Sequence, residues 1–378
     1  RADNAFMFEA PYTDFDEFNA NLTSMGDQFF GPFYTGLYKS ILSANNVIEN
    51  SLDATEVGEA KFLRALAYFK LVRVFGDVPI NLSAEPSATD ESILARQRAA
   101  DVYSTVIIPD LEAAIAALGT GITDGRASRL AAQGMLGKVY VQLGNFNSAE
   151  AHLAAVINEA DGADIRLQAN YADIFGVDND LNAEVIYATQ ISSSITDEYG
   201  FSEFAQWYAG LDTKSLEPLD ADLIAAFGGM DSPDLRFPVV VDTSTMTASA
   251  KWPQTGSSDH DWIELRLADV ILLYAETLNE NGGSAESVLD LLDPIRARAG
   301  LEPLDHTVLN SPALVRQAIQ DERRLELAFE GQRWFDLVRT NTVSAEMGET
   351  VDSKFYLFPI PISEVLSSFG VITQNEGY

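Results

Sequence analysis

The 378-residue sequence predicts a mostly α-helical protein. Apolar residues recur at helical spacing over several long segments, and glycine or proline ends or breaks these segments. Residues 129–158 carry small and large side chains at the offsets of a tetratricopeptide unit. Residues 159–261 interrupt the helical pattern and hold only short β-like runs, such as 184–188. We therefore expect a helical scaffold with an irregular, β-containing insertion packed on it.

Three helical segments follow an aromatic-rich start. Residues 1–36 contain many aromatic side chains without sustained periodicity, so we expect an irregular segment there. Apolar residues at helical spacing predict helices over 37–50, 56–75 and 99–118. Pro109 breaks or kinks the third segment, because proline removes a backbone donor.

The repeat in residues 129–158 predicts how the helices pack. Gly137 lets two helices approach and Gly144 allows the turn between them. The matching positions are Leu136, Gly137, Tyr140, Gly144, Phe146, Ala149 and Leu153. One helix pair cannot bury its apolar faces alone, so stacked neighbours are required. With a looser repeat in 262–299, we expect about four tetratricopeptide-like pairs, over residues 37–158 and 262–340.

The stretch from Gln320 to Arg339 carries carboxylates among apolar residues. Ala318, Leu325 and Phe329 share one helix face, and Glu322 falls within that stripe. A carboxylate facing the core needs a cation or donors, because an unpaired buried charge is costly. The glutamates there are either catalytic acids or partners in a structural ion-pair network. They are Glu322, Glu326 and Glu330, with Arg323, Arg324 and Arg333 as nearby cations and Asp336–Arg339 as an i, i+3 pair. We favour the network, because no histidine, cysteine or nucleophile is adjacent.

Composition excludes several classes of protein. Asp and Glu number 57 against 24 Lys and Arg, a formal charge of −33, which makes nucleic acid and anionic membranes poor partners. The surface suits neutral or cationic ligands. There are no cysteines, so disulfides and thiolate metal sites are excluded. No apolar run approaches the ~20 residues that span a bilayer.

Catalytic and metal-binding motifs are also lacking in the sequence. The three histidines are far apart, and no phosphate loop or nucleophile elbow occurs. Residues 178–184 begin like a calcium loop, but Ala183 replaces the sixth-position glycine and Thr189 the twelfth-position glutamate. We therefore expect no catalytic residues, no cofactor and no metal site.

Five blocks of sequence, in order, resemble the SusD/RagB family. They are the Arg-x-Asp-Asn start at residues 1–4, RALAYFKLVRVFGDVPI at 64–80, ELRLADVILLYAE and IRARAGL at 264–301, ERRLELAFEGQRWFDLVR at 322–339, and the Pro-Ile-Pro segment with the Gln-Asn-x-Gly-Tyr ending at 359–378. The resemblance runs from Arg1 to Tyr378. It implies one SusD-like domain over residues 1–378, and we expect the family's lipid-bearing N-terminal region to be absent from this sequence.

The resemblance also implies a function. SusD-like proteins are lipid-anchored at the cell surface in the outer membrane and capture glycans without breaking a bond. They hand the oligosaccharide to a SusC-like, TonB-dependent transporter, which would be the partner here. The alternative is a peptide-binding, RagB-like uptake protein, for which the negative charge mildly favours cationic peptides.

Aromatic side chains outside the expected helices are the candidates for stacking on sugar rings. The family's ligand platform favours the loops at 26–36 and 195–212. The candidate binding residues are Trp207, Tyr208, Tyr199, Trp252, Phe30 and Tyr34, with Phe29 and Phe33 beside the last two. Trp262, at the start of an expected helix, and Trp334 are assigned to the core.

Overall fold

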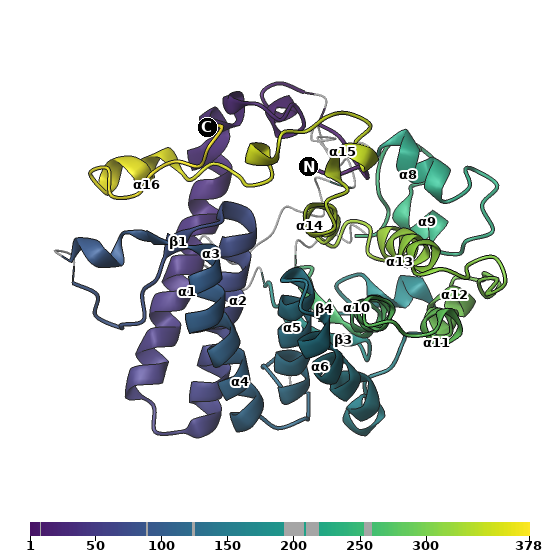
Figure 1. Ribbon diagram of the computed structural model, residues 1–378, viewed down its shortest axis with the longest axis horizontal. Helices are drawn as coiled ribbons and strands as arrows, with labels where there is room; N and C mark the ends of the chain where they lie inside the picture. The colour runs from purple at the N-terminus through teal and green to yellow at the C-terminus, as the bar shows by residue number, and fades with distance from the viewer. Residues whose placement is uncertain (8, 88–89, 123–124, 193–207, 209–218, 253–258) are drawn as a thin grey trace.

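The structure is a computed structural model that describes residues 1–378 except 8, 88–89, 123–124, 193–207, 209–218 and 253–258. Its main feature is a row of helices in which each packs against the next. In order, these helices are α1 (Gly31–Asn50), α2 (Ala54–Phe75), α4 (Ile108–Ala117), α5 (Arg129–Gln142), α6 (Phe146–Glu159), α10 (Leu267–Glu280) and α13 (Pro312–Glu326). Figure 1 shows α1 and α2 at one end of this row, α5 and α6 in the middle, and α10 to α13 at the other end.

Shorter elements surround the row. The helices are α3 (Ala99–Val102), α8 (Ala221–Ala226), α9 (Phe237–Val240), α11 (Ala285–Leu289), α12 (Asp293–Arg298), α14 (Arg333–Arg339), α15 (Val343–Glu346) and α16 (Ile362–Ser367). Two antiparallel strand pairs form small sheets, β1 (Val78–Pro79) with β2 (Arg96–Gln97), and β3 (Val185–Thr189) with β4 (Trp262–Arg266). The C-terminal tail with α16 crosses over α1 and α2 (Figure 1).

The helices begin and end where the sequence provides caps. Asp53 accepts a hydrogen bond from the Thr55 amide at the start of α2, and Gly76, with φ of 72°, follows its last residue. Between α5 and α6, a Cβ atom on Gly137 would lie 2.6 Å from the Leu153 side chain. The close approach expected at Gly137 is therefore confirmed.

Two boundaries differ from the sequence prediction. Helix α1 begins at Gly31, six residues earlier than expected, because Pro32 fits the first helical turn, where its missing N–H is not needed. Residues 262–266 were expected to open a helix, but they form strand β4, whose pairing with β3 satisfies their backbone groups. The β-like run at 184–188 is confirmed as β3.

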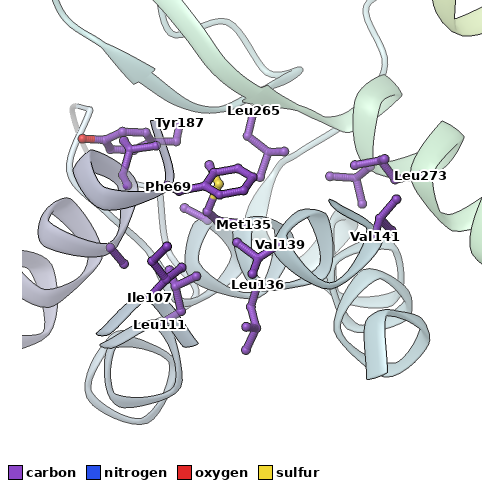
Figure 2. Packing of buried hydrophobic residues seen from close by; sticks show 14 of the residues in the cluster. Phe69, Ile107, Leu111, Met135, Leu136, Val139, Val141, Tyr187, Leu265 and Leu273 are labelled. Atoms are coloured by element: carbon purple, nitrogen blue, oxygen red, sulfur yellow. The ribbon is translucent and has the colours of Figure 1, made fainter. Parts of the chain in front are cut away.

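The main apolar core fills the space between the paired helices. Phe69 of α2, Met135 of α5 and Leu265 of β4 belong to this cluster, as Figure 2 shows. A second cluster lies under the irregular part and includes Trp252 and Phe329. Among the described helices, none is both long enough and apolar enough to cross a bilayer.

Candidate functional site

The glutamates of α13 and the following turn belong to a buried ion-pair network. Arg266, fully buried on β4, bonds to Glu330 at 2.7 Å, Glu184 at 2.8 Å and Glu326 at 2.7 Å. Burial opposes ionisation of Glu330, but the charges of Arg266 and Lys251 hold the pKa of its carboxyl below the usual range. The structural network is thus confirmed, and the Glu330 carboxylate is an ionised acceptor within it.

The cations of this network come from farther away in the sequence than expected. Glu322 bonds to Arg236 at 2.6 Å and to Arg296 at 3.0 Å. The three arginines that were predicted to serve these glutamates have other partners: Arg323 pairs with Asp269 and Asp336, while Arg324 and Arg333 pair with Asp3. The predicted pair Asp336–Arg339 is present at 2.8 Å.

The pairing with Asp3 fixes the N-terminal segment over α13 and α14. Arg333 donates to both carboxylate oxygens of Asp3, at 2.7 and 2.6 Å, and Arg324 donates to Asn4 at 3.0 Å. This segment forms one wall of a cavity of about 790 Å³. The other walls are α1 and α2, β4, and the turn between α13 and α14.

Aromatic and charged side chains line the cavity together. The aromatic ones are Phe6, Phe15, Phe29, Phe30, Phe33, Tyr208, Trp262, Phe329, Trp334, Phe335 and Phe358, and the charged ones are Arg1, Asp16, Lys70, Arg73, Glu264, Glu330 and Arg333. A site of this size with apolar walls and a few polar groups has the character of a ligand pocket.

Local backbone geometry positions the half-buried ring of Trp262. Gly331 has φ of 69°, and a Cβ atom there would lie 2.8 Å from Cζ2 of Trp262. The ring is stacked on Trp252 behind it, with 6.3 Å between centroids. Glu264, which follows Trp262 by two positions on β4, bonds to Lys70 of α2 and accepts a hydrogen bond from the Thr189 hydroxyl at 2.7 Å. The period of the strand thus brings Trp262 and Glu264 to the same cavity.

Helix α2 contributes its cations at helical spacing. Lys70 and Arg73, one turn apart, both line the cavity. The guanidinium of Arg73 lies between two rings, 4.2 Å from the centroid of Phe69 and 4.3 Å from that of Phe335. Burial lowers the pKa of Arg73 from its ordinary value, but arginine remains protonated at any physiological pH.

The predicted binding residues fall into three groups. Tyr199 and Trp207 lie outside the described residues. Tyr208 is half-buried at the cavity, 4.9 Å from the Phe329 ring, and Phe30 lies in the cavity wall against Phe358 at 5.1 Å. These two stay candidates.

The remaining two predicted residues are core residues. Trp252 is 3% exposed, donates from its indole to the Phe329 carbonyl at 3.3 Å and packs edge-on against Phe175. Tyr34 is also 3% exposed and packs on Phe75 at 5.2 Å, because α1 starts early and turns this residue toward α2. Neither ring has an open face, which removes both from the candidate site.

Trp262 and Arg73 are among the cavity residues that sequence reasoning missed. Trp262 was assigned to the core of a helix, whereas it lies on a strand with its ring at the cavity. The alternation of Trp262 and Glu264 within residues 262–266 was the available signal. Within the described part of the chain, no three His, Asp or Glu side chains are grouped so that they could hold a metal ion.

Comparison with known proteins finds one group of similar sequences. The family model described as "SusD family" matches residues 240–352, and one described as "Starch-binding associating with outer membrane" matches residues 2–141. SusD-like protein P2 of Formosa agariphila is 26% identical over 95% of this chain and 83% of the relative. The chain is thus similar to SusD-like proteins over nearly its whole length.

Solved structures share the complete SusD-like fold. A SusD superfamily protein from Parabacteroides distasonis superposes with a TM-score of 0.83 at 21% identity, covering 100% of this chain and 92% of that one. A laminarin binding SusD-like protein has a TM-score of 0.79 at 25% identity, with the same two coverages. The predicted mostly α-helical SusD-like scaffold with tetratricopeptide-like pairing is therefore confirmed.

Proposed function

We propose that this SusD-like protein captures an oligosaccharide or a segment of a polysaccharide in the aromatic cavity, without breaking a bond. The observation that carries the proposal is the meeting of Trp262, Tyr208 and several phenylalanines with polar side chains around one hollow. Aromatic faces stack on the apolar faces of sugar rings, while carboxylates, amides and cations bind the hydroxyl groups. A related SusD-like protein that binds laminarin supports a saccharide as the ligand.

The carboxylates at the cavity support binding without hydrolysis. Glycosidases use a pair of carboxyl groups, of which one donates a proton. Glu264 is engaged by Lys70 and Thr189, and Glu330 is held ionised by Arg266 and Lys251. Burial raises the pKa of the third carboxyl, Asp16, yet neither of the other two is free to act with it as an acid–base pair.

The cellular location that we propose is the one that the resemblance to SusD-like proteins implies. We place the protein at the cell surface in the outer membrane, held by an N-terminal lipid anchor and acting with a SusC-like, TonB-dependent transporter. The family description "associating with outer membrane" supports the membrane location. The test is affinity purification of the tagged protein from outer membranes of its host, where a TonB-dependent transporter should co-purify.

The binding test is an affinity-gel and calorimetric screen against neutral and acidic polysaccharides, with Trp262→Ala beside wild type. We expect one glycan class to bind with no product released, and the variant to bind about tenfold more weakly, because it loses the stacking surface. Phe369→Ala is the matched control, since Phe369 is 98% exposed on the tail and does not line the cavity. Binding of peptides and of no glycan would instead support the RagB-like alternative.

A further inference from the structure

The half-buried Arg73 differs in its contacts from three other arginines that lie inside the protein. Arg236, Arg266 and Arg339 each bond to two or more carboxylates. Among the described residues, Arg73 has neither a hydrogen bond nor an ion pair: it contacts the faces of Phe69 and Phe335, and its Nε is buried without an acceptor. A guanidinium that is partly removed from water without a paired anion is unfavourable, so the cavity that it lines favours a ligand with negative charge.

The charge balance around the cavity is opposite to that of the chain. Four bases line it, Arg1, Lys70, Arg73 and Arg333, against three acids, Asp16, Glu264 and Glu330. Over the whole sequence, acids outnumber bases by 57 to 24. The charges of Glu264, Asp336 and Asp269 act on Arg73 from a distance. Glu264 is paired with Lys70, and the two aspartates are paired with Arg323, so none of the three forms an ion pair with Arg73.

We propose that the cavity selects a saccharide that carries an anionic group, a carboxylate or a sulfate ester, and that Arg73 binds this group. This inference rests on the proposed function and specifies its substrate class. The two flanking phenyl rings hold the guanidinium in place, so little side-chain freedom is lost when it binds an anion. Trp262 supplies the surface on which the adjoining sugar ring stacks.

The overall charge of −33 does not oppose this selection at the site. Exposed charges are screened over about 8 Å at physiological ionic strength, whereas Arg73, half-buried in the cavity wall, would contact the anion directly. A direct, charge-assisted hydrogen bond therefore outweighs repulsion from distant acids. The acidic surface slows the approach of an anionic glycan, so binding should be slow at low salt and the dissociation rate should carry the selectivity.

The experiment compares acidic glycans with chemically neutralised copies of the same chains. Calorimetry would measure a uronate-containing and a sulfated polysaccharide, each beside its carboxyl-reduced or desulfated form, with wild type, Arg73→Gln and Arg98→Gln. Arg98 is the matched control, because its side chain is 76% exposed, pairs with the neighbouring Asp101 and does not line the cavity. We expect wild type and Arg98→Gln to bind at least one acidic form ten or more times tighter than its neutral copy. Arg73→Gln should lose this preference.

The same set of variants distinguishes a loss of folding from a loss of anion binding, and it tests the alternative ligands. Arg73→Gln removes an unpaired charge, so its thermal midpoint should equal or exceed that of wild type, and Arg73→Lys should keep part of the preference. If neutral forms bind as well as acidic ones, or if Arg73→Gln keeps the preference, the inference is overturned while glycan capture stands. If no glycan binds, both the proposed glycan capture and the selection of an anionic saccharide are refuted. If only an acidic peptide such as oligoglutamate binds, Arg73 receives a protein segment, and the inference is again overturned.

Discussion

Replacing Gly331 with alanine tests whether the turn between α13 and α14 positions Trp262. Gly331 has φ of 69°, and its missing Cβ leaves room for the indole, with Cζ2 at 2.8 Å and Cη2 at 3.3 Å from the ideal Cβ position. Alanine therefore brings two costs, a left-handed backbone and an overlap with the ring. The overlap falls on Trp262, the residue that we expect to stack on a sugar.

The size of each cost follows from the structure. A non-glycine residue in the left-handed region costs about 1–2 kcal/mol. A contact at 2.8 Å lies well inside normal van der Waals distance, so the indole has to shift away from its stacked position over Trp252, at a cost of about 1–3 kcal/mol for overpacking. We expect Gly331→Ala to lower the free energy of unfolding by about 2–5 kcal/mol in total.

A second glycine separates the two costs. Gly348 has φ of 68° and nothing within 4 Å of its ideal Cβ, so Gly348→Ala carries the backbone cost alone. Urea unfolding of both variants, followed by tryptophan fluorescence, gives the difference between them, and calorimetry gives glycan affinity. We expect a larger loss of stability and a weaker affinity only for Gly331→Ala. Equal destabilisation and unchanged affinity in both variants would refute the idea that this turn positions Trp262.

Two further predictions concern the buried ion-pair network. Glu326→Gln should lower the free energy of unfolding by about 3–5 kcal/mol, because it leaves Arg236, Arg266 and Arg298 short of one carboxylate charge. The control Glu349→Gln, at an exposed position, should change the free energy of unfolding by less than about 0.5 kcal/mol. Small changes of similar size in both variants would contradict a stabilising role of the network. Burial opposes ionisation of Glu326, but the charges of Arg298, Arg266 and Arg236 hold its pKa well below the usual range. The native state therefore binds fewer protons than the unfolded state, so this stabilisation is complete above the unfolded pKa of about 4.3 and is lost as pH falls further. Urea unfolding from pH 7 to pH 2 should show this loss in wild type and a shallower slope in Glu326→Gln; parallel slopes would count against it.

Patterns local in sequence predicted the fold well. Helical periodicity located the long helices, and the small residue at Gly137 identified a close helix pair that the structure confirms against Leu153. The acidic run in α13 predicted a buried network, because a carboxylate on an apolar stripe has few other options. These features depend on neighbours within one or two turns, which the sequence displays directly.

The partners and the site depend on residues distant in the sequence. Glu326 is served by Arg236 and Arg266, which are 90 and 60 positions away, and no local pattern indicates such a pairing. An aromatic residue in an irregular segment looks the same in sequence whether its ring is buried, as in Trp252, or faces a cavity, as in Trp262. Which rings are accessible was decided by long-range packing.

The bond between Asp3 and Arg333 joins positions 330 apart, and Arg1 donates to the carbonyl of Phe355, 354 positions away. Contacts of such high sequence separation close late, because a long loop has to be ordered first. The row from α1 to α6 can pair step by step as it leaves the ribosome. The N-terminal wall of the cavity instead bonds to Leu219 and Asp220, and its contacts with Arg333 and Phe355 form only after those residues have been made. During translation, the segment that holds Arg1 and Asp3 is thus made long before Arg333 and Phe355, which hold it in place, and in that interval its aromatic residues most need protection from aggregation.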